Sequence, residues 1–228
     1  MNFLLEGIGR GLNLLSSLDP QLLEIILLSL LVSGTATLLA GLLALPLALG
    51  LALRDFPGRR LLIGVCNTAL AVPAVLIGLL VYLLLSRNGL FGAAGLLFTP
   101  WAMIIAQALL ALPIVTALSL AAIKGQVAET RDLAYALGAG RWQMIRALLS
   151  EARFAFLTAL ITAFSRVIGE TGMTMMVGGN IRGHTRVMTT AIALETMKGN
   201  FELGIALGLV LIVVALLVNV LLQFMQGK

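Results

Sequence analysis

Four residues with hydrogen-bond donors lie close together in the last third of the chain. They are Asn180, Arg182, Thr185 and Arg186, with glycines at positions 178, 179 and 183 beside and between them. Because glycine has no side chain, backbone N–H groups at these positions can approach a ligand closely. Amide, hydroxyl and guanidinium donors in such a loop suit an anion, and two arginines suit a divalent oxyanion. An ordinary polar loop, with arginines facing water or lipid phosphate, is the open alternative.

A second pair of chemically active residues, Arg166 and Glu170, lies four positions apart at the end of an apolar run. This spacing places both side chains on one face of a helix. Because an ionisable group is costly in an apolar setting unless it is paired, we expect a mutual ion pair that fixes this end of the helix. Direct anion binding by Arg166 is the alternative, and it requires Glu170 to turn away.

Other reactive groups are scarce. The single cysteine, Cys66, has no partner for a disulfide, and the single histidine, His184, has no companion at metal-ligand spacing. Met173, Met175 and Met176 lie near neither, so flexible packing explains them better than a soft-metal site. No G-x-x-x-x-G-K-[ST] phosphate loop occurs in the sequence. We therefore expect no catalytic, metal or ATP site in this chain, and a membrane-embedded enzyme is disfavoured.

Composition indicates the setting in which these residues work. Hydrophobic residues make up 60% of the 228 residues, charged residues 11%, and the mean hydropathy is +1.08. A soluble domain of this size cannot bury so much apolar surface, so the chain is predicted to be an integral membrane protein. The net charge of +5 comes from basic residues scattered between apolar runs. This distribution does not suit nucleic acid binding.

Five apolar runs are long enough to cross a bilayer as helices. They cover residues 22–53, 61–85, 101–123, 154 to about 168, and 203–224. We predict a single all-α permease domain over 1–228, with residues 1–21 at the membrane surface. Prolines at positions 46, 73 and 113 lie inside three of the runs and predict kinks, which shape a cavity or pack against other protein.

The distribution of lysine and arginine predicts the orientation of the chain. Nine of them fall on the side of the loops after the first and third runs, and five fall on the opposite side. The positive-inside rule then places the N-terminus outside, the C-terminus in the cytoplasm, and the long loop 124–153 in the cytoplasm.

The cytoplasmic loop contains the pattern of two helices joined by a turn. Leu133, Ala134 and Leu137 share one face of a short helix, Gly138 and Gly140 favour left-handed or flexible backbone that ends it, and Arg141 begins a second helix. A two-turn helix is marginal in water by itself. It must therefore dock, either on its own bundle or on another protein.

The order Asp132, Ala134, Gly138, Ala139 resembles the cytoplasmic E-A-A-x-x-x-G loop of ATP-binding-cassette importer permeases. The sequence departs from that pattern at Asp132, where Glu is usual, and at Ser150, where many members have proline. The resemblance implies the importer-permease fold and a coupling helix that contacts an ATPase subunit. The coupling residues it implies are Asp132, Ala134, Leu137, Gly138, Ala139 and Arg141.

A second resemblance covers residues 165–204. The motifs G-E-x-G at 169–172 and G-N-I-x-G-x-T-R at 179–186 are similar to those of tungstate and molybdate permeases. Arg182 stands where the molybdate type has proline, so the tungstate type fits better. The resemblance implies that residues 170–202 form the gate and outer loop. Together with the donors and the ion pair described above, this gives the candidate translocation and gate residues Arg166, Glu170, Thr171, Gly172, Asn180, Arg182, Thr185 and Arg186.

These features together predict a permease of the prokaryotic inner membrane that imports a tetrahedral oxyanion, tungstate before molybdate, by alternating access. Since the chain has no ATP site, two copies of a partner ATPase subunit must bind ATP and Mg²⁺. Five helices are few for enclosing a path, so we expect a second copy of the chain. An extracytoplasmic oxyanion-binding protein would deliver the cargo. The alternative is a carrier driven by an ion gradient, which predicts internal repeats and several intramembrane carboxylates.

Overall fold

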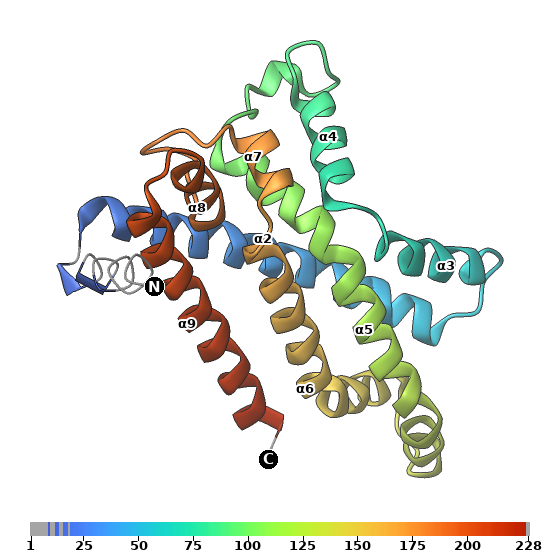
Figure 1. Ribbon diagram of the computed structural model, residues 1–228. Coiled ribbons are helices and arrows are strands. Elements are labelled where there is room, and N and C mark those ends of the chain that lie inside the picture. Colours follow the sequence, from blue (N-terminus) through green and yellow to red (C-terminus); the bar gives the residue numbers. More distant parts are fainter. Residues whose placement is uncertain (1–8, 10–11, 14–15, 18, 227–228) are drawn as a thin grey trace.

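The computed structural model describes residues 9, 12–13, 16–17 and 19–226, and within them the regular structure is entirely helical (Figure 1). The predicted surface segment 1–21 lies largely outside the described residues. The elements are α2 (Pro20–Leu53), α3 (Arg59–Ala69), α4 (Ala74–Leu85), the 3₁₀ helix η1 (Gly92–Ala94), α5 (Pro100–Ala136), α6 (Arg141–Ile168), α7 (Gly172–Gly178), α8 (Met188–Met197) and α9 (Phe201–Gln226).

Four described stretches are single helices long and apolar enough to cross a membrane. They are Pro20–Leu53, Pro100–Gly125, Trp142–Ile168 and Phe201–Val218. Four of the five predicted spans are thereby confirmed as helices, and so is the all-α membrane class. The Asp19 carboxylate caps the first by accepting hydrogen bonds from the backbone N–H groups of Gln21 and Leu22.

The predicted second span, 61–85, is covered by two helices with a sharp break at the position of the predicted kink, so it is either one broken span or a re-entrant segment. α3 ends at Ala69, α4 begins at Ala74, and the two are bent by 103°. Pro73 stands just before α4 in an extended conformation, with φ −60° and ψ 130°. Proline disfavours helix at the residue before it, which explains why the chain breaks here. By contrast, Pro46 and Pro113 lie within the continuous helices α2 and α5.

The predicted boundaries of the loop 124–153 also differ from those observed. No separate two-turn helix forms, because α5 continues to Ala136. The second predicted helix and the fourth span are one helix, α6, so this span starts at Trp142 and not at 154. Position 150 is serine. A proline at this position would have interrupted α6, so the serine is consistent with a continuous helix.

The core forms where α5 packs between α2 and α6. On α2 the contact surface is a row of alanines spaced four residues apart, Ala36, Ala40, Ala44 and Ala48, all fully buried. Small side chains at this spacing let two helices approach closely, as in other membrane bundles. A second cluster joins α8 and α9 to α2 and α6 through Ile25, Ile168, Met188 and Leu207.

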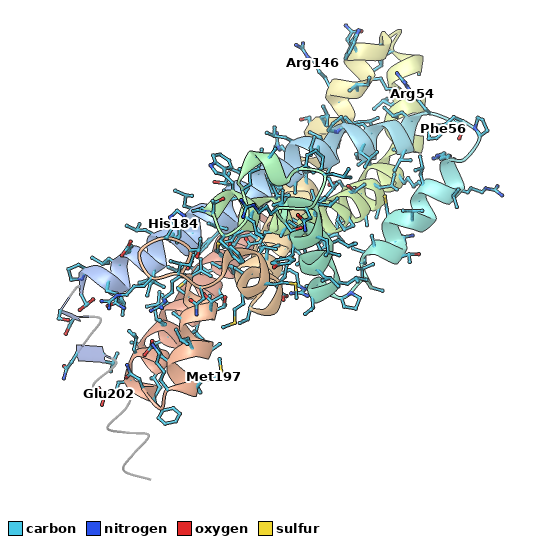
Figure 2. All side chains as sticks on the ribbon, turned by 90° about the horizontal axis from the view of Figure 1, so that it is seen from above. Arg54, Phe56, Arg146, His184, Met197 and Glu202 are labelled. Atoms are coloured by element: carbon cyan, nitrogen blue, oxygen red, sulfur yellow. The ribbon has the colours of Figure 1, made fainter. Side chains whose placement is uncertain are left out.

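The functional segments lie at opposite ends of the molecule. In Figure 1, α7 and α8 lie at one end of the bundle, and the turn between α5 and α6 lies at the other. Figure 2 shows Arg54, Phe56 and Arg146 together at one end, and His184 and Met197 at the other. The loop after α2 and the α5–α6 turn therefore share a side, as the predicted topology requires.

Candidate functional site

The α5–α6 turn is built around one left-handed glycine. Gly138 has φ +72°, which favours glycine because a Cβ is disfavoured there. Of the two glycines expected to supply left-handed or flexible backbone, only Gly138 is left-handed, and Gly140 is extended. It has φ −73° and ψ 166°, and it precedes the first turn of α6. The Gln143 Oε1 atom accepts a hydrogen bond from the Gly140 N–H at 2.7 Å, which satisfies one free donor at this helix start.

The turn has an anchored inner side and an apolar outer side. Ala139 packs against the buried side chains of Met144 and Leu148. Leu133, Leu137 and Trp142 are 63%, 77% and 80% exposed, and we refer to these three as the apolar tip. The side chains of Asp132, Ala134 and Arg141 lie outside the described part of the chain. The outer side of the turn therefore presents three large apolar side chains that the described chain does not cover.

Arg166 and Glu170 form the predicted ion pair at the end of α6. The Arg166 Nη1 atom lies 2.7 Å from Glu170 Oε2, with the arginine side chain 48% and the glutamate side chain 11% exposed. The Glu170 backbone carbonyl accepts hydrogen bonds from the hydroxyls of Thr174 and Thr189. Thr171 and Gly172 follow directly and begin α7. Glu170 is therefore fixed by its cation and by its backbone, and it does not stand as an isolated charge.

Buried contacts connect α7 to α5 and α4, and the sequence analysis did not predict them. The Gln107 Nε2 atom lies 3.5 Å from Thr174 Oγ1, and both residues are buried. α7 also lies against α4, where a Cβ added to Gly78 would lie 3.0 Å from the Cα of Met173. Gln107 is the one amide in the apolar run 101–123, and that signal would have identified it.

In the loop between α7 and α8, two of the four predicted donors hold the loop itself. Asn180, with φ +52°, donates from Nδ2 to the Thr190 carbonyl at 3.2 Å. The buried Thr185 hydroxyl donates to the Gly178 carbonyl at 2.5 Å and accepts from the Ile181 N–H at 3.0 Å. Both side chains therefore hold the loop in shape through bonds within it.

The two arginines of this loop retain donor capacity. Arg182 is exposed, and its Nη2 atom donates to Gln21 Oε1 at 2.6 Å, which ties the loop to the start of α2. Arg186 donates from Nη2 to the Asn180 carbonyl at 3.5 Å. Its Nε atom and the Asn180 Oδ1 atom are buried, and neither has a hydrogen-bond partner among the described residues. An anion at this loop would meet two guanidinium groups.

A buried carboxylate on α8 offsets part of this positive charge. Glu195 pairs with Lys198 at 2.9 Å and accepts a hydrogen bond from Asn200 Nδ2 at 3.0 Å. The hydrogen bond from Lys198, with smaller contributions from Asn200 and Arg186, holds the pKa of Glu195 below its ordinary value. Within the described chain, no three His, Cys, Asp or Glu side chains gather in a group able to hold a metal ion.

Comparison with known proteins decides the family. Residues 23–228 match the family described as binding-protein-dependent transport system inner membrane component. The chain belongs to this family. It is 41% identical, over the whole of both chains, to the tungstate uptake system permease protein TupB of Peptoclostridium acidaminophilum. It is 37% identical to TupB of Campylobacter jejuni, over 96% of this chain and 92% of that one. The molybdenum permease ModB of Escherichia coli is 30% identical, over 76% and 79%.

Solved structures confirm the importer-permease fold. The chain superposes on the crystal structure of a bacterial alginate ABC transporter in complex with alginate pentasaccharide-bound periplasmic protein, with a TM-score of 0.73. The match covers 91% of this chain and 79% of the other at 21% sequence identity. At that identity the likeness concerns the fold alone. The resemblance that the coupling loop and the oxyanion motifs carry is thus confirmed at the level of the family.

Proposed function

We propose that this chain is the membrane-spanning subunit of an ATP-driven tungstate importer. The observation that carries the proposal is the full-length identity of 41% with a tungstate uptake permease, against 30% over three quarters of the chain for a molybdenum permease. The two oxyanions have the same shape and charge. The preference for tungstate therefore rests on relatedness, and molybdate is the second candidate.

The apolar tip supports coupling to a separate ATPase. Leu133, Leu137 and Trp142 are exposed at the end of two long helices, and Ala139 fixes the turn between them to the bundle. A partner that buries the tip can push or pull α5 and α6 as levers. Two ATPase subunits, which bind ATP and Mg²⁺, would dock one on each of two permease chains. ATP-driven closure of these subunits brings the turns together, and hydrolysis separates them.

In this proposal the α5–α6 turn lies in the cytoplasm and the loop between α7 and α8 lies outside, in the inner membrane of a prokaryote. The N-terminus is then outside, and the C-terminus lies in the cytoplasm. An oxyanion-binding protein delivers tungstate to the outer end, where Arg182 and Arg186 meet the anion. Arg166 and Glu170 hold the junction of α6 and α7 beneath that loop, where a gate would open and close.

Uptake into proteoliposomes tests the proposal. We consider vesicles in which the ATPase faces the interior and the binding protein is outside. They should accumulate tungstate only when ATP is present in the interior. Molybdate in place of tungstate gives the second arm, and a difference in initial rate decides the cargo. Transport that continues without ATP and follows an imposed ion gradient would show a secondary carrier instead.

The variant Leu137→Glu separates coupling from folding. We expect it to lower co-purification of the ATPase at least tenfold, because it places a charge in an apolar contact. Leu90→Glu is the matched control, since Leu90 is 84% exposed in the turn between α4 and η1. Equal loss of ATPase from both variants would contradict docking at the apolar tip.

A further inference from the structure

An apolar groove of about 350 Å³ lies between α2, α5 and α6. Its walls include Leu45 from α2, Ala122 from α5, and Phe156 and Leu157 from α6. All of these residues belong to stretches that are apolar enough to cross the membrane; Leu45 and Ala122 lie in the halves nearest the α5–α6 turn, and Phe156 and Leu157 lie at the middle of α6. The groove is therefore a hollow of the membrane-embedded bundle, and its volume is within the range of small-ligand sites.

One polar side chain lining this groove has no partner. Ser119 is buried, and its hydroxyl makes no hydrogen bond to any described residue. Other hydroxyls in the membrane helices donate to the carbonyl four residues earlier, as Ser29, Thr37, Thr116 and Thr158 do. Ser119 departs from this rule where it lines the groove, and its buried hydroxyl is left with an unused donor.

A cation stands at the same groove. Arg153 lines it and is exposed, its guanidinium carbon lies 4.7 Å from the ring centroid of Phe154, and it forms no ion pair with the described residues. Lys124 and Arg146 are exposed at this end of the bundle as well, and Figure 2 shows Arg146 at the tip of this end. Among the described side chains at this end, Asp55 and Glu151 are acidic and Asp55 is paired with Arg59, so the described basic side chains outnumber the acidic ones. An occupant with an anionic head and an apolar tail complements this distribution.

We propose that the groove binds an anionic phospholipid from the leaflet on the side of the α5–α6 turn. One acyl chain packs against Leu45, Phe156 and Leu157, the phosphate pairs with Arg153, and an ester carbonyl accepts from Ser119. Apolar walls at membrane depth exclude a soluble anion, and the arginine disfavours a zwitterionic lipid with no net charge. A bound lipid joins three helices beside the coupling turn, and it stabilises the arrangement that presents the apolar tip.

Native mass spectrometry and thermal unfolding of the full chain in detergent test this site directly. The probes are phosphatidylglycerol and phosphatidylcholine with identical acyl chains. We expect phosphatidylglycerol to be retained more and to raise Tm more than phosphatidylcholine. Arg153→Gln should lower retention of phosphatidylglycerol about tenfold through loss of a charge-assisted contact. Ser119→Ala should lower it by a smaller factor.

Two filling variants distinguish this groove from general lipid adhesion. Ala122→Phe occupies the groove and should abolish the preference for phosphatidylglycerol. Ala155→Phe is the matched control, because Ala155 lines a neighbouring hollow of α5 and α6 with Leu118 and Thr158. Equal retention of both lipids, or the same effect of both variants, would overturn the proposal. The proposal would also be overturned if the Ala122→Phe variant kept its lipid but no longer formed dimers. The groove would then be filled by a second copy of the chain. These measurements need neither tungstate nor ATP. The lipid proposal can therefore fail while the proposed transport function stands, and the reverse is also possible.

Discussion

Replacing Gly138 by alanine tests how the coupling turn is built. At φ +72° a residue with a Cβ costs about 1–2 kcal/mol more than glycine. No neighbouring atom lies within 4 Å of the position that the Cβ would occupy, so the cost is backbone strain and not a clash. Ala139 holds the inner side of the turn against Met144 and Leu148, whereas Leu137 is exposed, so a change of the turn mainly moves its outer side. We therefore expect the turn to remodel, which reduces the fraction of chains that present the apolar tip correctly.

Gly140 supplies the matched control two residues away. Its φ is −73°, and an added Cβ would have the Gln143 Oε1 atom 3.8 Å away, an ordinary contact. Gly140→Ala should therefore be nearly neutral, whereas Gly138→Ala should weaken ATPase binding about 5- to 30-fold, the factor that corresponds to 1–2 kcal/mol. The assay is the Kd of the ATPase subunit for permease in nanodiscs, with Tm measured in parallel. Equal Kd values for the two variants would refute the reasoning about the turn.

Three further changes test other parts of the structure. Arg166→Gln leaves the largely buried Glu170 carboxylate without its cation and should lower the free energy of unfolding by about 1–3 kcal/mol. Adding Glu170→Gln should restore most of this loss, and additive losses would contradict the pairing. Gly78→Ala should cost about 1–3 kcal/mol because α7 backbone lies against it. Gly64→Ala, in open space, should gain about 0.5–1 kcal/mol, so equal effects would contradict the packing. The pKa of Glu195 is depressed in the folded state, so its stabilisation is full above the ordinary value of 4.5 and is lost as the pH falls through the lowered value. On acidification, the Tm of the wild type should therefore fall towards the Tm of the Glu195→Gln variant. If the Tm values of the two proteins changed with pH in parallel, the Glu195 carboxylate would contribute no stability.

The membrane helices could be predicted because a run of apolar residues long enough to cross a bilayer can be recognised from the sequence alone. Four predicted spans are single helices, and Asp19 before Pro20 marks the start of the first. The broken span could not be predicted in the same way. Pro73 indicates an irregularity, but whether the chain kinks slightly or turns by 103° depends on which helices pack against each half. Here α4 packs on α7, while α3 lies along α5.

In the candidate site too, contacts between residues close in sequence could be predicted, and contacts between distant residues could not. Arg166 and Glu170 could be paired from sequence, because a spacing of four residues on a helix brings side chains together whatever the fold. Gln107 and Thr174 are 67 positions apart, and only the packing of α5 on α7 brings them together. Asn180 and Thr185 were predicted as donors to an anion. Loop composition does not reveal which donors the loop uses internally, and the structure shows that both side chains do so.

Photo-crosslinking from the apolar tip tests the central claim most directly. A photoreactive amino acid at position 137 of the full permease, assembled with its ATPase, should crosslink to the ATPase subunit. The same probe at position 197, where Met197 is 71% exposed at the opposite end, should not. This result would place the motor on the α5–α6 turn. A crosslink to the ATPase from position 197, or none from position 137 in an assembled complex that hydrolyses ATP, would contradict the account.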